Sequence, residues 1–587
     1  MSDEKPIVYK TLADSPEIVI SEASMLWNKT GTWRYLRPKY ESKVPPCNQG
    51  CPAGNDVEGF IRLICEKEYA KAWRLLKEEN PFPGVCGRVC YHPCETVCNR
   101  LQYDQAIAIN LLERFASDQA PKDETPESLR KSSGKKIAVI GSGPAGLTAA
   151  YHLARMGHTV TVFEKEAKPG GLLRYGIPEY RLPNDILDSE IKDIMALGVD
   201  ITCDCAIGAD KSWEDIKKFD AVFISVGVYK SRKLGIEGEN SENCFSGLEF
   251  LSSIAKEKPL KPGKKTVVIG GGNAAIDSAR SALRFGSEVS LFYQRSRKEM
   301  PAFEEEIRDA EKEGLKIHYL RKPTKINVKD KVVTGIQFCG TILGSPDASG
   351  RRRPEIVSGT EFDIEADTII VAIGESADLG FLPPEIGIEN NQITVNEFGI
   401  TNQKGVFAGG DAALSVHNVA SAIGSGKAAA CAIDSWLSGT TLDKVKDRIV
   451  IGEQGALSVS RYLNLGKAHA NQVENRKVVT FSELNTNYFD QKARQKVQKL
   501  NIDSRRSEFK EINLGFDEKT AQEEAERCFH CGVCTMCDNC YVFCPDIAVS
   551  RKFGGKSGYD IAFDYCKGCG ICVNECPRSA MLMEKEL

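Results

Sequence analysis

Apolar and polar positions divide the middle of the chain into short strand-like runs and longer helical segments. A helical segment follows the first run, where Leu147, Ala150 and Leu153 share one face. Runs that alternate with helices in this way are typical of doubly wound α/β domains, and we expect two of them. The continuous apolar runs, which resemble buried parallel strands, are 137–140, 160–163, 266–270, 289–294 and 368–374.

A glycine-rich turn, GSGPAG, joins the first apolar run to its helix. Gly141 suits the tight turn, Gly143 lets backbone N–H groups approach a pyrophosphate, and Gly146 lets helix and strand pack closely. Glu164 ends the next strand, where it can accept hydrogen bonds from a ribose. Strand, turn, helix, strand and acid in this order predict a dinucleotide site; the alternative is a glycine-rich turn without a ligand.

A second fingerprint, GGGNAA, follows the run at 266–270. Its strand ends in YQRSR rather than in an acid, and Arg295 and Arg297 are placed to accept a 2′-phosphate. This favours NADP(H), with a solvated turn as the alternative. The candidate nucleotide-binding residues of this fingerprint, besides the two arginines, are Gly270, Gly272, Asn273 and Ala275.

The chain then returns with the run at 368–374, the segment GVFAGGDAA and a helix at 420–433. One nucleotide-binding unit is therefore inserted within another, the layout of flavoproteins that bind two dinucleotides. Asp411, at the end of a short apolar strand, is placed to hold flavin ribityl hydroxyls.

Cysteines are concentrated at the two ends of the chain: seven of the 22 lie between Cys47 and Cys98, and ten between Cys528 and Cys576. The C-terminal group contains the duplicated run of two-[4Fe–4S] ferredoxins, in which each fourth cysteine crosses to the other cluster; zinc is the alternative. The first ferredoxin quartet comprises Cys534, Cys537, Cys540 and Cys576. The second ferredoxin quartet comprises Cys566, Cys569, Cys572 and Cys544.

Six of these N-terminal cysteines, at 47, 51, 86, 90, 94 and 98, lie in Gly- and Pro-rich loops, mostly with three residues between neighbours. Thiolates at such spacing suit zinc or an iron–sulfur cluster, and the spacing does not choose between them. Between them, the periodicity predicts one amphipathic helix over 57–76.

Composition narrows the class of protein. A hydrophobic content of 42%, a charged content of 27% and a net charge of −4 are ordinary for a globular protein and do not favour a nucleic-acid partner. No run of 18 apolar residues and no signal-peptide core occur, so we expect a cytoplasmic protein without a transmembrane segment.

We expect a multidomain α/β protein with a helical iron–sulfur domain, two nested Rossmann-like domains and a ferredoxin-like α+β domain. The segment 440–527 is charged, and we expect it to be mostly helical. Trp27, Trp33, Tyr35 and Tyr40 belong to an arm that either packs on the protein, which we favour, or docks a partner. The expected divisions are arm 1–40, iron–sulfur 41–130, FAD 131–228 and 366–437, NAD(P) 229–365, linker 438–527 and ferredoxin 528–587.

Seven motifs occur in the order PPCNQGCPAG, NPFPGVCGRVCYHPCE, GSGPAG, GGLLRYGIPEYRLP, GGGNAAID, YQRSRKEMPA and GVFAGGD. Together they resemble the small subunit of NADPH-dependent glutamate synthase, a module also found in dihydropyrimidine dehydrogenase and in NADH-dependent ferredoxin:NADP oxidoreductase. The resemblance runs from about Cys47 to Leu437 and implies FAD at the first fingerprint and NAD(P)H at the second. The implied FAD contacts are Glu164, Leu172, Arg181, Gly410 and Asp411, to which we add Pro144, Ala145, Lys165 and Gly171.

The resemblance also implies two N-terminal [4Fe–4S] clusters. For one, Cys51, Cys90 and Cys94 match thiolate ligands and Glu113 matches a side-chain oxygen ligand; the alternative is a glutamate on a helix surface. We call these four residues the inner site. The other family cluster uses Cys47, Cys98 and a preceding CxxC pair, but no cysteine precedes Cys47 in this sequence.

A distant pair has the setting of the missing segment: EAERCFHCG contains Cys528 and Cys531. Our hypothesis is that this pair completes a cluster with Cys47 and Cys98, a set that we call the junction site. Three or four clusters are therefore expected, with Cys86 as a spare ligand. The family sequence YRRSR is YQRSR here, so Gln294 weakens the preference for NADPH and NADH stays open.

The ferredoxin end and the stretch NKTGTWRY are similar to the NAD(P)H:acceptor oxidoreductase associated with dissimilatory sulfite reductase. Electrons would move between NAD(P)H, FAD and clusters to or from an iron–sulfur protein such as ferredoxin or that reductase. Alternatives are a subunit of an electron-bifurcating or glutamate synthase-type complex, a flavin disulfide reductase through Cys203 and Cys205, or a binding module. A homodimer is one expected assembly, and hydride transfer requires no catalytic acid or nucleophile, so none is named.

Overall fold

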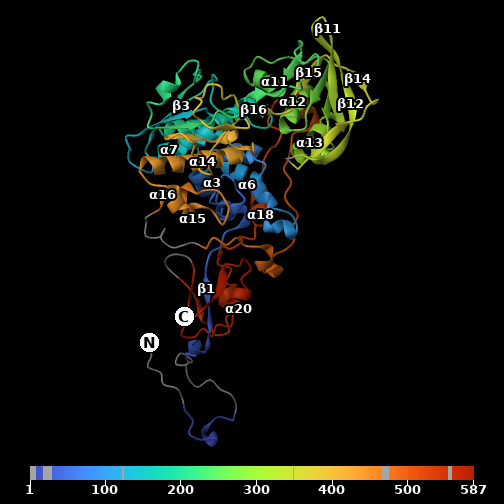
Figure 1. Ribbon diagram of the computed structural model, residues 1–587. Helices are drawn as coiled ribbons and strands as arrows, with labels where there is room; N and C mark the ends of the chain where they lie inside the picture. Colours follow the sequence, from blue (N-terminus) through green and yellow to red (C-terminus); the bar gives the residue numbers. More distant parts are fainter. Residues whose placement is uncertain are drawn as a thin grey trace.

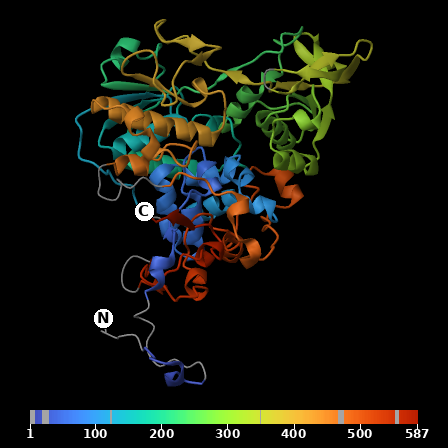
Figure 2. The ribbon, with the colours of Figure 1, turned by 60° about the horizontal axis from the view of Figure 1, so that its bottom comes forward.

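The computed structural model describes residues 8–17, 29–121, 124–347, 350–465, 475–552 and 558–586, and Trp27 lies outside them. Two α/β domains lie side by side above a helical domain, and a small C-terminal module hangs below it (Figure 1). Figure 2, turned to bring the bottom forward, shows the red module next to the blue helical domain. This arrangement confirms the expected fold class. Among the described residues, no helix combines the length and apolarity needed to cross a bilayer.

The first α/β domain has a five-stranded parallel sheet in the order β19-β5-β2-β3-β4. Every residue of β5 is buried, as expected of a central parallel strand. Helices α7 and α14 pack closely, since a Cβ on Gly426 would lie 2.2 Å from the Ala145 carbonyl oxygen. The elements are β2 (Lys136–Ile140), α7 (Pro144–Arg155), β3 (Thr159–Phe163), α8 (Leu172–Tyr175), α9 (Asn184–Ala196), β4 (Asp200–Thr202), α10 (Trp213–Ile216), β5 (Ala221–Ile224), β17 (Ile388–Glu389), β18 (Gln392–Ile393), β19 (Val406–Ala408), η6 (Gly410–Ala412) and α14 (Val419–Leu437).

The second α/β domain is inserted between β5 and β19. Its parallel sheet has the order β10-β9-β8-β15-β7, and an antiparallel sheet of β11 to β14 lies beside it. The elements are β7 (Cys244–Ser246), α11 (Gly247–Ala255), β8 (Lys265–Ile269), α12 (Asn273–Arg284), β9 (Glu288–Tyr293), η5 (Arg297–Glu299), α13 (Glu304–Lys312), β10 (Lys316–Tyr319), β11 (Arg321–Lys329), β12 (Val332–Pro346), β13 (Arg352–Ile356), β14 (Phe362–Glu365) and β15 (Thr368–Val371).

The two chain crossings between the α/β domains pair with each other. β6 (Lys230–Ser231) leaves the first domain and lies antiparallel to β16 (Glu375–Ser376), which returns to it. β15 is hydrogen-bonded to β8 and β7, so the return comes after 371 rather than at 366 as expected. The apolar run at 368–374 therefore belongs to the second sheet.

The helical domain packs beneath the first α/β domain. The single helix expected over 57–76 is wrong, because Lys67 adopts a positive φ of 62° and separates α2 from α3. Asp56 caps α2 by accepting a hydrogen bond from the Gly59 N–H. The elements are α1 (Pro46–Gln49), α2 (Val57–Cys65), α3 (Tyr69–Glu79), α4 (Pro83–Val89), α5 (Pro93–Thr96), η4 (Asn99–Gln102) and α6 (Ile109–Asp118).

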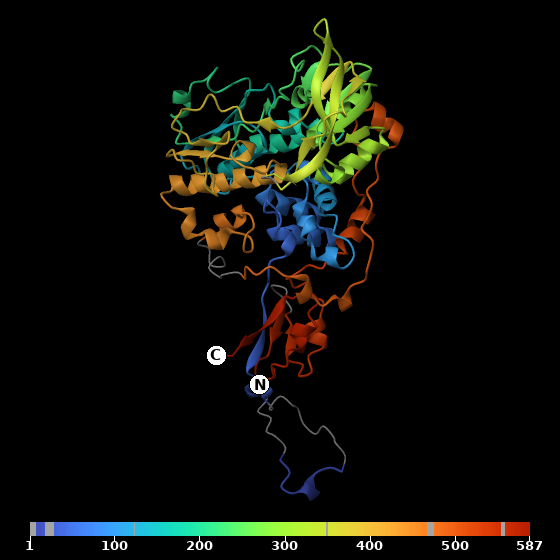
Figure 3. The ribbon, with the colours of Figure 1, turned by 45° about the vertical axis from the view of Figure 1, so that its right-hand side comes forward.

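The segment 438–527 is a strap rather than the mostly helical linker that we expected, because its described part is largely irregular between short helices. In Figure 3 this segment begins in orange beneath the first α/β domain, and its later part runs along the helical domain between the second α/β domain and the C-terminal module. Its helix α17 packs on α12, and α18 packs on α2 and α6. The elements are η7 (Leu442–Lys444), α15 (Lys446–Ile449), α16 (Val459–Leu463), η8 (Phe481–Glu483), η9 (Thr486–Tyr488), α17 (Ile502–Ser507) and α18 (Glu518–Ala525).

The C-terminal module contains two short antiparallel strand pairings and two cysteine-bearing helices. One pairing joins β20 to β21, and the other joins β22 to β1, a strand of the N-terminal arm. Trp33 and Tyr35 of the arm are exposed, whereas its strand packs on the module. The elements are η1 (Leu12–Asp14), η3 (Thr30–Trp33), β1 (Leu36–Tyr40), α19 (Asn539–Val542), β20 (Val549–Arg551), β21 (Tyr559–Ile561), α20 (Ile571–Asn574) and β22 (Met581–Lys585).

Candidate functional site

A cavity of about 930 Å³ lies where the helical domain and both α/β domains meet. The second α/β domain lines it with Asn273, Asp277 and Phe303, and the helical domain with Val89 and Tyr91. All but one of the residues that the sequence assigns to FAD also line it: Gly141, Gly143, Pro144, Ala145, Glu164, Lys165, Gly171, Leu172, Arg181, Gly410 and Asp411.

The glycines of the first turn have the geometry of a dinucleotide cradle. A Cβ on Gly146, the assigned residue outside the cavity, would lie 2.0 Å from the Gly141 carbonyl oxygen, so only glycine permits this helix–strand approach. A Cβ on Gly143 would meet no protein atom within 4 Å. The second fingerprint repeats the pattern: a Cβ on Gly270 would lie 2.1 Å from a backbone carbonyl, and one on Gly272 would meet nothing.

Glu164 and Asp411 face this cavity with different hydrogen bonding. The Glu164 carboxylate accepts hydrogen bonds from the Ser142 N–H at 2.9 Å and from the Glu166 N–H at 2.9 Å, which fix it beside the turn. Asp411 Oδ1 is buried and has no hydrogen-bond partner in the described part of the chain. A buried acceptor without a donor fits a ligand that brings hydroxyl groups, as the FAD ribityl chain does.

Arg181 joins the two α/β domains at the cavity wall. Its guanidinium lies 2.6 Å from Asp277 on α12, and both side chains are almost fully buried. Burial raises the pKa of Asp277 to about 6, against the opposite effect of Arg181. Sequence reasoning missed Asp277, although it lies one helical turn beyond Asn273 in GGGNAAID.

Both arginines assigned to a 2′-phosphate are held by carboxylates. Arg295 lies 2.9 Å from Asp347, and Arg297 lies 2.6 Å from Glu311 and 2.9 Å from Glu304. Neither arginine lines the central cavity, which leaves their contact with a nucleotide as a prediction.

The structure brings the four residues of the inner site together. Burial and the nearby Glu113 raise the pKa of the Cys51 thiol, and Cys51 and Cys90 act likewise on Cys94. Glu113 is buried rather than on a helix surface, and its Oε1 accepts a hydrogen bond from the Asn55 amide at 2.9 Å. Burial raises the pKa of Glu113 to about 8. Thiols beside a buried carboxyl suit a metal that replaces their protons.

Cys86 also lies near the inner site, because Glu113 and Cys90 contribute to raising the pKa of its buried thiol. It remains a spare candidate ligand. Two residues of this region were missed by sequence reasoning: Val89 and Tyr91 flank Cys90 and line the central cavity. Their only signal in the sequence was adjacency to Cys90, which itself does not line the cavity.

The junction site is also assembled across the fold. Burial and the nearby thiols of Cys98, Cys528 and Cys531 raise the pKa of Cys47 well above its ordinary value. The Asn99 amide donates a hydrogen bond to Cys531 Sγ at 3.5 Å. The expected proximity of these four cysteines is therefore present in the structure, and their ligation of iron remains a prediction.

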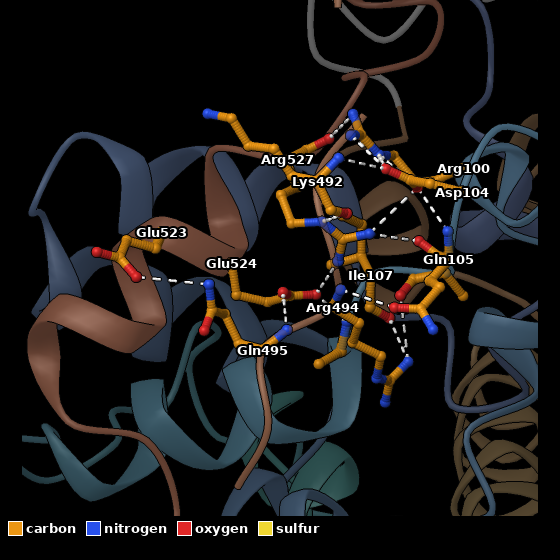
Figure 4. Close-up of polar contacts among 12 residues, drawn as sticks. Arg100, Asp104, Gln105, Ile107, Lys492, Arg494, Gln495, Glu523, Glu524 and Arg527 are labelled. Carbon is orange, nitrogen blue, oxygen red and sulfur yellow. Dashed lines mark hydrogen bonds and ion pairs between the residues drawn. The ribbon is translucent and has the colours of Figure 1, made fainter. Parts of the chain in front are cut away.

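A buried arginine anchors the strap where it reaches the junction site (Figure 4). Arg527 precedes Cys528, and its guanidinium lies 2.6 Å from Glu524 and donates a hydrogen bond to the Gln105 carbonyl at 2.6 Å. Arg100 donates in return to the Arg527 carbonyl at 2.7 Å. The strap is thus tied to the helical domain within two residues of Cys98 and one residue of Cys528.

The C-terminal cysteines group as the sequence predicts. The first ferredoxin quartet lines one small cavity. In the second, burial and the thiols of Cys566, Cys569 and Cys544 raise the pKa of Cys572 to about 12. The described residues contain no trio of His, Cys, Asp or Glu that converges as ligands of a single ion do, and all 22 cysteines are free. Four thiols around a shared cavity fit a cluster better than one zinc ion.

We expect substitution of Gly143 and of Gly272, the two glycines at which a Cβ would meet no protein atom, to weaken the binding of different nucleotides. Gly143→Ala places a methyl group where backbone must approach the FAD pyrophosphate, so FAD affinity falls about tenfold or more while the apoprotein folds normally. Gly272→Ala does the same to NAD(P)H and leaves FAD unaffected. Flavin absorbance per chain and nicotinamide titration measure the two effects. Equal FAD content in both variants would contradict the assignment of the first turn.

Three family profiles match the chain. Pyridine nucleotide-disulphide oxidoreductase covers residues 135–429, about half of the chain. Dihydropyrimidine dehydrogenase domain II, 4Fe-4S cluster, covers 39–125, and the 4Fe-4S binding domain covers 559–581. The matches therefore fall on both α/β domains, the helical domain and the C-terminal module.

Curated relatives extend over most of the chain. The NADPH-Fe(3+) oxidoreductase subunit beta of Geobacter sulfurreducens is 38% identical over 522 residues, which are 83% of this chain and 75% of that protein. The NADP(+)-dependent formate dehydrogenase subunit beta of Moorella thermoacetica is 38% identical over 518 residues, 83% and 70% of the two chains. The glutamate synthase [NADPH] small chain of Escherichia coli is 33% identical over 424 residues, 67% and 89%.

The profiles imply FAD and NAD(P)H in the α/β domains and [4Fe–4S] clusters at both ends, and the cavity, the partnerless Asp411 oxygen and the buried thiols fit these groups. The chain is an oxidoreductase that belongs to the pyridine nucleotide-disulphide oxidoreductase family, in its glutamate synthase small subunit-like group with 4Fe-4S domains.

Proposed function

We propose that this protein passes electrons between NADPH and an iron–sulfur partner protein through FAD and four [4Fe–4S] clusters. One observation carries the proposal: Val89 and Tyr91, which flank the inner-site residue Cys90, line the same cavity as the FAD-binding turn. The flavin site and the first cluster site therefore share a wall.

The residues divide the work between binding and orientation. The turn at 141–146 and the N-terminus of α7 hold a pyrophosphate, and Glu164 is fixed beside them for a ribose. Arg181 and Asp277 hold the second α/β domain against the first, so that a nicotinamide can face the flavin. Bound FAD converts a two-electron hydride donor into a source of single electrons.

Consecutive cluster sites follow one another along the fold. Both chain neighbours of the inner-site residue Cys90 line the flavin cavity. The junction site shares the helical domain with the inner site, and its Cys531 is three residues from Cys534 of the first ferredoxin quartet. Three residues span at most about 11 Å, so these two sites are neighbours. This order supports a route from the flavin to the C-terminal module.

NADPH is proposed as the nucleotide because three relatives carry NADPH or NADP(+) in their names. Arg295 and Arg297 would bind its 2′-phosphate in exchange for their present carboxylates. The names of two relatives also describe beta subunits, which favours assembly with a partner subunit. Ferredoxin is one candidate partner, and dissimilatory sulfite reductase, which rests on the ferredoxin end and the stretch NKTGTWRY, is another.

A glutamate synthase-type or electron-bifurcating complex is the second candidate function, favoured by identity to the glutamate synthase small chain. The chain then supplies electrons to a larger subunit instead of a free carrier.

Free cysteines throughout the chain favour a reducing compartment, so we propose a cytoplasmic location. We also propose a homodimer as one assembly.

Anaerobic titration of the purified protein with NADPH, and separately with NADH, tests the proposal. We expect NADPH to bleach the flavin absorbance and then the cluster absorbance, with an EPR signal from reduced clusters. Tighter binding of NADH would overturn the nucleotide assignment. Bleaching of the flavin without the clusters would overturn the proposed transfer of electrons from the flavin to the clusters and favour the bifurcating alternative.

A further inference from the structure

The N-terminal arm supplies an outer strand of the C-terminal module. β1 lies antiparallel to β22, with Leu36 opposite Lys585 and Tyr40 opposite Met581. In Figure 1 this blue strand lies within the red module. The arm is also held on both sides of β1: the Gly31 N–H donates to the Asp564 carbonyl at 2.8 Å, and the Lys43 N–H donates to the Gly532 carbonyl at 3.0 Å. Arm and module therefore form one folded unit.

The arm lies directly against a cysteine-bearing loop. A Cβ on Gly568, between Cys566 and Cys569, would lie 2.1 Å from the Leu36 carbonyl oxygen, so backbone touches backbone here. Arg34 donates a hydrogen bond to the Cys566 carbonyl at 3.2 Å, and its guanidinium lies 5.2 Å from the centre of the Phe563 ring. Such close packing fixes the position of the arm relative to the thiols.

Tyr40, the last residue of β1, reaches a thiol. Its hydroxyl donates a hydrogen bond to Cys540 Sγ at 3.2 Å. Its ring stacks on Tyr559, with the ring centres 5.9 Å apart and the planes 18° from parallel. Tyr40 also lines the small cavity of the first ferredoxin quartet. The ring is therefore held by packing, and the hydroxyl is held on the sulfur.

A hydrogen bond to a cluster sulfur changes the reduction potential of the cluster. Reduction adds negative charge, which spreads onto the sulfurs, and an O–H donor stabilises that charge. A tyrosine hydroxyl, with an ordinary pKa near 10, remains protonated at neutral pH and is therefore a permanent donor. The strand pairing delivers this donor from a residue 500 positions away in the sequence.

We propose that Tyr40 is a positioning residue that raises the reduction potential of the cluster held by the first ferredoxin quartet. The inference rests on the cluster ligation in the proposed function. The arm thereby sets the energy at which electrons arrive at this cluster, in addition to completing the sheet.

The test compares Tyr40→Phe with Tyr35→Phe in the full-length, cluster-loaded protein. Tyr35 is 89% exposed on the same arm, so its substitution removes a hydroxyl that touches no thiol. Redox titration followed by EPR gives the cluster potentials. We expect one potential to fall in Tyr40→Phe by an amount that makes reduction about tenfold less favourable, about 59 mV for a one-electron couple, and none to change in Tyr35→Phe.

Iron content and flavin content of all three proteins are measured first. A wild-type protein that lacks ferredoxin clusters after reconstitution would contradict the proposed function. Loaded Tyr40→Phe with wild-type potentials would overturn the role of Tyr40 alone. Loss of iron in Tyr40→Phe, with the remaining potentials unchanged, would show a purely structural role and overturn it as well. Resonance Raman bands of the iron–thiolate bonds provide a second readout, and we expect them to shift in Tyr40→Phe only.

Discussion

Replacing Cys528 and Cys531 together with serine is expected to remove one [4Fe–4S] cluster from the purified protein. These thiols lie beside Cys47 and Cys98 in the structure, and serine oxygens are poor ligands for iron–sulfur clusters. We expect the flavin to remain bound and to be reduced by NADPH, whereas the ferredoxin clusters lose their connection to it. Iron per chain, flavin per chain and stopped-flow reduction of the clusters measure these effects.

The matched control is Cys203→Ser, which changes a free cysteine of the first α/β domain away from every proposed cluster site. Its iron content and reduction rate are expected to equal those of the wild type. An unchanged iron content in the double variant would contradict the proposal that the junction site binds a cluster. In that case Cys47 and Cys98 would need another explanation for their position beside the strap.

Lys427→Met is expected to destabilise the contact between the helical domain and the first α/β domain by about 3–5 kcal/mol, the usual cost of leaving a buried charge without its partner. Lys427 lies on α14 and is fully buried, with its Nζ 2.7 Å from Glu79 at the end of α3. It also donates a hydrogen bond to the Ala53 carbonyl, two residues beyond Cys51. The free energy of unfolding, from urea titration followed by flavin fluorescence, measures the loss.

Lys446→Met provides the control for this substitution, since it removes the same side chain from an ion pair of similar length. Lys446 lies 2.6 Å from Glu397, but the two side chains are 41% and 55% exposed. An exposed pair contributes about 0–1 kcal/mol, so this variant is expected to unfold near the wild-type midpoint. Equal losses of unfolding free energy in both variants would mean that burial of the Lys427–Glu79 pair does not increase its contribution to stability.

Local patterns in the sequence predicted the elements of the nucleotide sites well. The turn from Gly141 to Gly146, its flanking strands and Glu164 occupy the positions that their spacing implied, because strand, turn and helix are all determined within about 30 residues. The prediction of one helix over 57–76 failed because α2 and α3 share one apolar periodicity. That periodicity does not reveal the single residue with positive φ, Lys67, that separates them. The prediction of a mostly helical segment at 440–527 failed for a related reason: charged residues of this segment bind to other domains instead of forming a helix surface.

Pairings between distant residues were predictable only where chemistry restricted the choice. A [4Fe–4S] cluster needs four ligands and the family resemblance left two of them unassigned, so the pair Cys528 and Cys531 could be matched to Cys47 and Cys98 from across the chain. No such count applies to Arg181 and Asp277, or to Tyr40 and Cys540, because arginine and tyrosine accept many partners. The carboxylates on Arg295 and Arg297 were missed on the same grounds, since the sequence contains 81 acidic residues.

The pairing of β1 with β22 also dictates when the protein can mature. The ribosome releases β1 early, and its partner strand follows only after both α/β domains have been synthesised, so the nascent chain carries an unpaired strand edge through most of translation. Iron delivered before residue 585 emerges finds neither the completed sheet nor the Tyr40 hydroxyl in place. The two-stranded sheet that places Tyr40 beside Cys540 therefore forms only after both α/β domains have been synthesised.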